Sequence, residues 1–259
     1  MRGTYTLVAL LALVPWCSPA RAAPRPVAVG VVDYASRYQW PKGDRAARAG
    51  LRDLEARLAD IGVAAERVSP DLFLRQNWPE RDRYQRLVIP PGAEFFSQAI
   101  HEGMDDYVRS GGLLITGVSL ILEDTDGDYV ITDSDRVTTG PSETFLGVHG
   151  HQGARMTRVK VLAACPLTRG VPVGEWVNLT APVSGRTTRN VSAEVVMLSD
   201  RQVADRPPAE QPFLTYKHMG NGACVYLVGQ AGGLADPTLR QVFRNLFAPE
   251  TLEWLCLQE

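Results

Sequence analysis

The sequence predicts an α/β fold built around a doubly wound, mainly parallel sheet, with an irregular or β-rich insertion in its second half. The first half alternates short apolar runs with segments of helical periodicity. Those runs are continuously apolar, which is typical of strands covered on both faces. The order strand, helix, strand, strand, helix, strand is that of a doubly wound sheet.

Four strands are expected in the first half, at residues 26–32, 63–68, 86–89 and 113–116. Two helices lie between them, at residues 44–62 and 96–108. Asp44 is the expected N-cap of the first helix, and Gly62 is its expected C-cap. The second helix is expected to end before Gly111 and Gly112.

The second half is less regular. Residues 119–155 are acidic and lack strong periodicity, so hairpins or a lid-like loop are expected there. Asn221-Gly222 between apolar runs predicts a hairpin, and Asp236-Pro237 predicts the start of a final helix that residues 252–257 extend. Residues 206–212 resemble a linker. Strand-like runs occupy residues 157–162, 193–198, 213–216 and 223–228.

The first 22 residues have the features of a secretory signal peptide. Arg2 precedes an apolar run over residues 7–14, and Ala20-Arg21-Ala22 forms a small-x-small cleavage pattern. The apolar run is too short to span a bilayer, which takes about 20 residues. We therefore expect a secreted or periplasmic protein, without membrane insertion, in which residues 23–259 form a single domain.

Charge and cysteine content exclude several functions. The chain has 27 basic and 29 acidic residues and no basic run, which argues against binding to nucleic acid or an anionic membrane. Beyond the leader, the three cysteines Cys165, Cys224 and Cys256 allow at most one intramolecular disulfide. Cys224 lies in an apolar run and is expected to be a buried, inert thiol.

Several motifs resemble a known superfamily. Leu87-Val-Ile-Pro-Pro-Gly92 is followed by a helix that runs into Tyr107-Val-x-x-Gly-Gly112, and then by Gly117 and Ser119-Leu120. This order is similar to the class I glutamine amidotransferase-like superfamily, and within it to the beta-galactosidase trimerisation-domain branch and its secreted relatives.

Two later motifs extend the resemblance over most of residues 27–256. Cys165-Pro-Leu-Thr-Arg-Gly-Val-Pro172 is similar to a Pro-Leu-Thr-x-Gly segment of that branch, and Met219-Gly-Asn-Gly-Ala-Cys-Val-Tyr226 to its closing hairpin and strand. The resemblance implies a flavodoxin-like domain that is attached to, or found beside, carbohydrate-processing enzymes. A homo-oligomer or a partner enzyme would fit such a domain.

The catalytic residues of the amidotransferases are not at their expected places. Those enzymes have a nucleophilic Cys on the turn after the strand equivalent to residues 113–116, where this chain has Thr116-Gly-Val-Ser119, and a His after a late strand, where residues 228–233 contain none. A non-catalytic binding or assembly module is therefore expected. The alternative is a serine hydrolase that uses Ser119 with His149 or His151 as base, although Ile121 replaces the second Gly of a nucleophile elbow.

Two groups of residues suggest metal sites. His149 and His151 could bind a metal or act as a base, and the other interpretation is that both lie in an exposed loop. Asp124, Asp126, Asp128 and Asp135 imitate positions 1, 3, 5 and 12 of a calcium loop, but Tyr129 replaces its Gly. We expect a solvated acidic hairpin and no cofactor, with calcium as the alternative.

A ligand site is expected where the parallel strands end, because open α/β sheets bind ligands at their carboxyl edge. Aromatic rings beside a carboxylate and an Arg suit a sugar or another small polar ligand, whereas the alternative is that Tyr38 and Trp40 only cover the sheet edge. The candidate binding residues are Asp33, Arg37, Tyr38, Trp40, Gly92 and Ser119.

Overall fold

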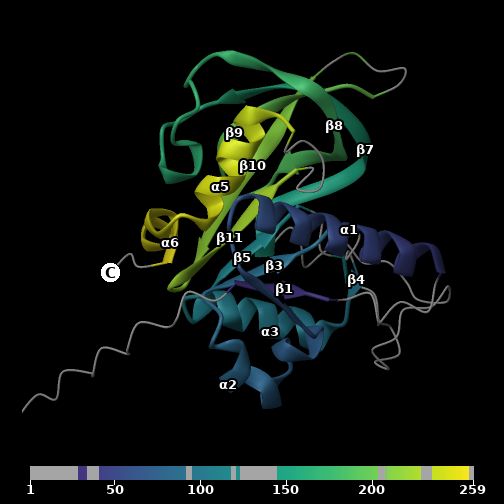
Figure 1. Ribbon diagram of the computed structural model, residues 1–259, viewed down its shortest axis with the longest axis vertical. Coiled ribbons are helices and arrows are strands. Elements are labelled where there is room, and N and C mark those ends of the chain that lie inside the picture. Colours follow the sequence, from purple (N-terminus) through teal and green to yellow (C-terminus); the bar gives the residue numbers. More distant parts are fainter. Residues whose placement is uncertain are drawn as a thin grey trace, which may run out of the picture.

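A single large sheet organises the protein. The computed structural model describes residues 29–33, 41–91, 95–117, 121–122, 145–203, 207, 209–228 and 235–256. Among them, nine strands form one sheet in the order β2-β1-β3-β5-β11-β10-β9-β7-β8, and β4 (Phe95–Phe96) pairs with β6 (Ile121–Leu122) apart from it (Figure 1). The prediction of an α/β fold is confirmed.

Five neighbouring strands of the sheet are parallel. The three central strands β1, β3 and β5 are buried at every residue, as their continuous apolar runs predict. All four strands expected in the first half are present, and each pairs in parallel with its neighbour. The bounds are β1 (Val29–Val32), β2 (Ala65–Val68), β3 (Arg86–Ile89), β5 (Leu113–Thr116) and β11 (Gly222–Leu227).

Helices cover both faces of the parallel strands. Figure 1 shows these strands between α1 (Pro41–Asp60) on one side and α3 (Gln98–Arg109) on the other. On the side of α1 lie α5 (Pro237–Phe247) and α6 (Pro249–Cys256), and Arg240 of α5 forms an ion pair with Asp60 of α1 at 2.8 Å. No helix in the described part of the chain is long and apolar enough to cross a membrane.

The first helix differs from its predicted bounds at the N-terminus. It starts at Pro41, so the prediction of Asp44 as its N-cap is wrong. Proline is tolerated in a first helical turn because its missing N–H has no intrahelical partner there. The predicted end is confirmed: Gly62 has a φ of +78°, and the next amide, of Val63, donates to the Leu58 carbonyl at 2.8 Å.

A compact connection between β2 and β3 was not expected from the sequence. It contains the 3-10 helices η2 (Pro70–Phe73) and η3 (Arg75–Asn77) and the short helix α2 (Trp78–Arg81). Arg81 is only 2% exposed, and its charged group has partners inside the protein. Its Nη1 donates to the Gly103 carbonyl at 3.3 Å, and its guanidinium lies 4.5 Å from the centre of the Trp78 ring. These contacts hold the connection between β2 and β3 against α3.

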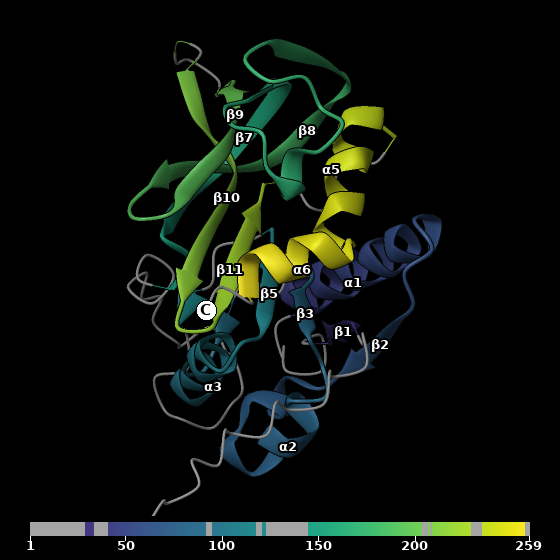
Figure 2. The ribbon, with the colours of Figure 1, turned by 90° about the vertical axis from the view of Figure 1, so that its left-hand side faces the viewer.

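The second half extends the sheet with four antiparallel strands, β7 (Val148–Val161), β8 (Trp176–Asn190), β9 (Glu194–Arg201) and β10 (Ala209–Met219). The β-rich insertion is confirmed, but β7 begins nine residues before the predicted run, and β8 was not predicted. β8 is an edge strand with mainly polar residues, so its sequence lacks the apolar pattern of a covered strand. Figure 2 shows these long strands above the parallel part of the sheet.

Two expectations for the connections are wrong. β10 starts at Ala209 and includes Pro212, within the stretch expected to be a linker. Proline is accommodated there because the pairing with β9 shifts register between Pro212 and Leu214. At the C-terminus, α6 is a separate helix and does not extend α5, because Pro249 follows Ala248, which has an extended conformation.

A buried carboxylate closes an irregularity between β7 and β9. The side chain of Asp200 accepts hydrogen bonds from the Thr157 amide at 2.7 Å, the Thr157 hydroxyl at 2.6 Å and the Arg158 amide at 2.9 Å. Burial alone raises the pKa of Asp200. The hydrogen bonds from Thr157, Arg158 and Gln202 outweigh this effect and hold the pKa below its ordinary value.

We expect Asp200→Asn to destabilise the protein at neutral pH and to flatten its loss of stability in acid. Because the pKa of Asp200 is lower in the folded state, its contribution is present above the unfolded pKa of about 3.9 and is lost as the pH falls through the folded pKa. Urea denaturation from about pH 7 to about pH 3 measures this difference. Parallel curves for wild type and variant would contradict the assignment.

Candidate functional site

The carboxyl ends of the parallel strands form one edge, where the sequence places a ligand site. Asp33 directly follows β1, and its amide donates to the Val68 carbonyl of β2 at 2.8 Å. Its side chain is half-buried, and its role in binding stays a prediction. The other candidates, Arg37, Tyr38, Trp40, Gly92 and Ser119, lie outside the described residues.

The two candidate histidines lie in a strand. His149 and His151 belong to β7, and His149 pairs with Arg189 of β8, so the interpretation of both as loop residues is wrong. Backbone pairing with β8 extends the strand to Val148, although the segment lacks a strong apolar pattern. The role of these histidines with Ser119 in a hydrolase stays a prediction.

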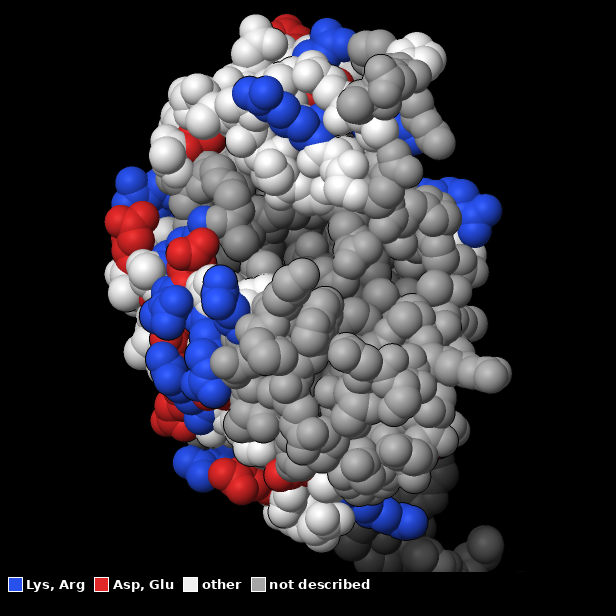
Figure 3. Space-filling model, turned by 90° about the vertical axis from the view of Figure 1, so that its right-hand side faces the viewer, with Lys and Arg blue, Asp and Glu red and all other residues white. Residues whose placement is uncertain are grey.

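The calcium hypothesis also stays a prediction. Asp124, Asp126, Asp128 and Asp135 lie outside the described residues. Within the described ranges, no three or more His, Cys, Asp or Glu side chains come together as a metal site. On the face in Figure 3, basic and acidic side chains are interspersed among the described residues, as the sequence's mixed charge pattern indicates.

The three described cysteines are free thiols in different surroundings. Cys224 is 1% exposed, and burial raises its pKa well above the ordinary value, so the interpretation of Cys224 as a buried thiol is confirmed. Burial likewise raises the pKa of Cys256 to about 12. Cys165 is half-buried at the start of a loop.

Thiol alkylation should distinguish these cysteines. We expect iodoacetamide to modify Cys165 in the folded chain that lacks residues 1–22. Cys224 and Cys256 should react only after unfolding, because the thiolate is the reacting species and burial raises the pKa of both thiols. Peptide mass spectrometry before and after urea treatment measures the order. Equal labelling of Cys224 and Cys165 in the folded protein would contradict the buried placement.

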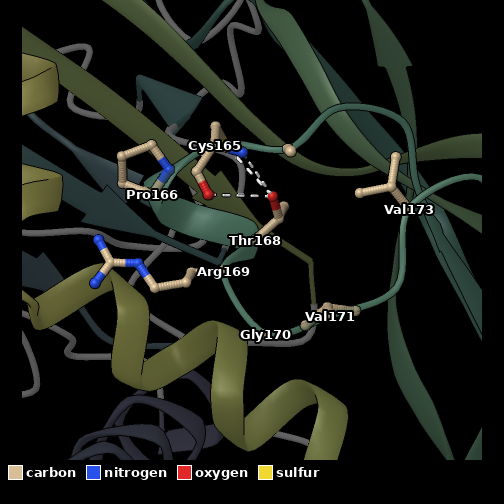
Figure 4. Close-up of a pocket in the computed structure, with 8 residues that line it drawn as sticks. Cys165, Pro166, Thr168, Arg169, Gly170, Val171 and Val173 are labelled. Carbon is tan, nitrogen blue, oxygen red and sulfur yellow. Dashed lines mark hydrogen bonds between the residues drawn. The ribbon is translucent and has the colours of Figure 1, made fainter.

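The Cys165–Val173 loop contains the Pro-Leu-Thr-x-Gly motif, and residues of this motif hold the loop in its conformation. In the 3-10 helix η4 (Pro166–Thr168), the Thr168 hydroxyl donates to the Ala163 carbonyl at 2.9 Å. The same hydroxyl accepts from the Cys165 amide at 3.0 Å (Figure 4). Leu167 is fully buried, and Gly170 has a φ of +81°, which favours glycine. Leu167, Thr168 and Gly170 of the motif therefore each have a structural role.

The same loop forms a pocket of about 500 Å³. Asn245 of α5 holds the loop against the helix, with its Nδ2 donating to the Leu167 carbonyl at 3.1 Å and the Arg169 carbonyl at 2.8 Å. In Figure 4 the Arg169 side chain extends toward the helices, where it pairs with Glu250 at 3.2 Å. The sequence motif was visible, but nothing in it indicated a pocket. The lining residues are Ala164, Cys165, Pro166, Thr168, Arg169, Gly170, Val171 and Val173.

Comparisons with known proteins identify the fold. No protein-family model and no curated protein matches the chain. A beta-galactosidase from Bacillus circulans sp. alkalophilus is similar over 87% of this chain and 31% of its own, with 13% identity and a TM-score of 0.55. A beta-galactosidase from Rahnella sp. R3 is similar over 85% of this chain and 31% of its own, with 14% identity and a TM-score of 0.53.

A ThuA-like protein from Bacteroides uniformis is similar over nearly its whole length. The match covers 89% of this chain and 94% of that protein, with 13% identity and a TM-score of 0.56. By contrast, this chain spans about a third of the length of the beta-galactosidases. Likeness at such low identity shows the fold alone. These neighbours are consistent with the branch that the motifs resemble.

Proposed function

We propose that this protein is a secreted, non-catalytic binding or assembly module of carbohydrate metabolism, with a glutamine amidotransferase-like fold. The main support is that its fold is similar to about a third of each beta-galactosidase chain, while it covers nearly all of a ThuA-like protein. A fold that occurs as one part of larger carbohydrate-processing enzymes suits a module that binds a ligand or assembles with other protein chains.

The topology supports a flavodoxin-like assignment within this proposal. The parallel strands occur in the order β2-β1-β3-β5-β11, and numbering these five strands along the chain gives the order 2-1-3-4-5 of flavodoxin-like sheets. Such sheets serve many functions, so the fold alone favours no reaction.

Sedimentation velocity and saccharide titration test the proposal. We expect a homo-oligomer, a saccharide complex, or both, and no turnover of nitrophenyl glycosides or nitrophenyl esters. A strict monomer that binds no saccharide would overturn the binding and assembly role. Labelling by a fluorophosphonate that is lost in Ser119→Ala would overturn the non-catalytic role and favour the hydrolase.

Secretion is tested separately. Because Ala20-Arg21-Ala22 follows an apolar run, the exported protein should begin near Ala23. Intact-mass spectrometry of protein recovered outside the cytoplasm measures its N-terminus. Export of a chain that keeps Met1 would contradict cleavage of the leader.

A further inference from the structure

A cluster of aromatic side chains lies where α6 meets the end of β10. Tyr216 and His218 are on β10 and Trp254 is on α6. The Tyr216 and Trp254 ring centroids are 4.7 Å apart, Tyr216 and His218 are 5.2 Å apart, and His218 and Trp254 are 6.5 Å apart. Tyr216 and Trp254 are half-buried and His218 is exposed, so the cluster is open to solvent.

We call Tyr216, His218, Trp254 and the adjoining Glu194 the aromatic corner. The His218 ring has a fixed orientation within it. Its Nδ1 lies 3.1 Å from the Leu255 carbonyl oxygen. Because a carbonyl only accepts hydrogen bonds, Nδ1 carries the proton. In the neutral imidazole, Nε2 is then the acceptor.

Glu194 completes the corner from the neighbouring strand. It is directly opposite Tyr216 in the antiparallel pairing of β9 and β10, so both side chains extend from the same face of the sheet. Burial raises the pKa of Tyr216, and the negative charges of the Glu194 carboxylate and of the Cys165 thiolate raise it further. The Glu194 side chain is exposed.

The corner adjoins the pocket formed by the Cys165–Val173 loop. After β7, the Leu162 amide donates to the Val196 carbonyl of β9 at 2.9 Å, and the chain continues to Cys165 and η4. Cys165 lines the pocket, and η4 of the same loop contacts α6, which carries Trp254. The pocket therefore lies beside the helix that carries Trp254.

We propose that the aromatic corner binds an uncharged saccharide. Tyr216 and Trp254 are half-buried, and the exposed part of an aromatic ring binds the apolar C–H groups of a sugar on its electron-rich face. The Glu194 carboxylate and His218 Nε2 accept hydrogen bonds from sugar hydroxyls, and the Tyr216 hydroxyl both donates and accepts. This inference deepens the proposed binding role and rests on it.

The charge of the corner selects against acidic sugars. Its carboxylate comes from Glu194, whereas Lys217 follows Tyr216 on the strand and therefore points to the opposite face, where its Nζ donates to the Ser192 hydroxyl at 3.0 Å. A uronate would place a second carboxylate beside Glu194, and like charges in contact repel. Neutral saccharides should therefore bind more tightly than uronates.

Calorimetric titration of residues 23–259 with galactobiose, mannobiose, cellobiose and galacturonate tests the site. We expect at least one neutral disaccharide to bind with a Kd on the order of 1 mM, and galacturonate to bind at least about tenfold more weakly. Glu194→Gln should weaken binding about tenfold or more, since it removes a charged acceptor. Tyr216→Phe should weaken it by a smaller factor while preserving the ring.

Glu210→Gln is the matched control. Glu210 is an exposed carboxylate on the same strand, opposite Asp200 and far along β10 from Tyr216, so its replacement should leave the affinity unchanged. Nitrogen NMR of the imidazole should show a shift of His218 Nε2 on addition of the bound sugar. Circular dichroism establishes that each variant is folded.

Three outcomes would overturn the site: no neutral disaccharide binds, binding is unchanged in both Glu194→Gln and Tyr216→Phe, or the His218 resonances do not respond. If a saccharide binds elsewhere or the protein forms a homo-oligomer, the proposed function stands and only the aromatic corner is rejected. If it neither oligomerises nor binds any saccharide, both proposals fail.

Discussion

Gly103→Ala should destabilise the protein by about 3 kcal/mol or more. A Cβ added at Gly103 of α3 would lie 1.9 Å from the carbonyl oxygen and 2.7 Å from the carbonyl carbon of Phe73 in η2. These are backbone atoms, so relief requires that the helix and the 3-10 turn move apart. That movement would also disturb the hydrogen bond from Arg81 to the Gly103 carbonyl.

Urea denaturation followed by circular dichroism measures this loss. Gly153→Ala is the control, because a Cβ at this exposed position of β7 meets nothing within 4 Å. We expect the control to change the unfolding free energy by less than about 0.5 kcal/mol. Similar stabilities for the two variants would contradict the close approach of α3 to η2.

Asp236→Ala should cost about 3 kcal/mol of unfolding free energy through two connected effects. Asp236 is 2% exposed, and its Oδ1 caps α5 by accepting from the Thr238 amide at 2.9 Å and the Leu239 amide at 3.1 Å. Its Oδ2 accepts from the Thr180 amide of β8 at 2.8 Å. The variant would lose both the helix cap and the connection to the edge strand.

Ser69→Ala is the comparison for Asp236→Ala. Ser69 caps η2 through one hydrogen bond of 3.2 Å to the Asp71 amide, and it is exposed, so we expect a loss of less than about 1 kcal/mol. Asp236→Asn should lie between the two, because the amide oxygen can still cap α5 while its NH₂ group cannot accept from Thr180. Equal stabilities for Asp236→Ala and Ser69→Ala would show that Asp236 acts as a simple cap.

Asp236 also explains how the free edge of the sheet is protected. Between the pairs Met156–Val183 and Arg158–Asn178, β8 has four residues, 179–182, where β7 has only Thr157. This bulge contains Pro182, which has no amide to donate, and Thr180, whose amide is bound by Asp236. Bulges and prolines hinder the addition of a further strand to an edge.

Local sequence patterns determined the parallel half of the fold. The apolar runs of β1, β3 and β5, the Gly62 helix end and the Asp236 helix start are each defined by a few neighbouring residues. Burial of a strand on both faces requires a continuous apolar run, and capping requires specific residues at the helix ends, so these elements can be predicted without tertiary contacts.

Tertiary contacts alone decided the edge strand β8 and the corner between β10 and α6. β8 is an edge strand whose polar sequence lacks periodicity, and it is held by pairing with β7 and by Asp236, which follows Thr180 by 56 residues. Likewise, Tyr216 and Trp254 meet only because α6 packs beside β11 (Figure 2). A single sequence records local preferences, whereas the pairing of distant segments depends on which surfaces the other elements leave to be buried.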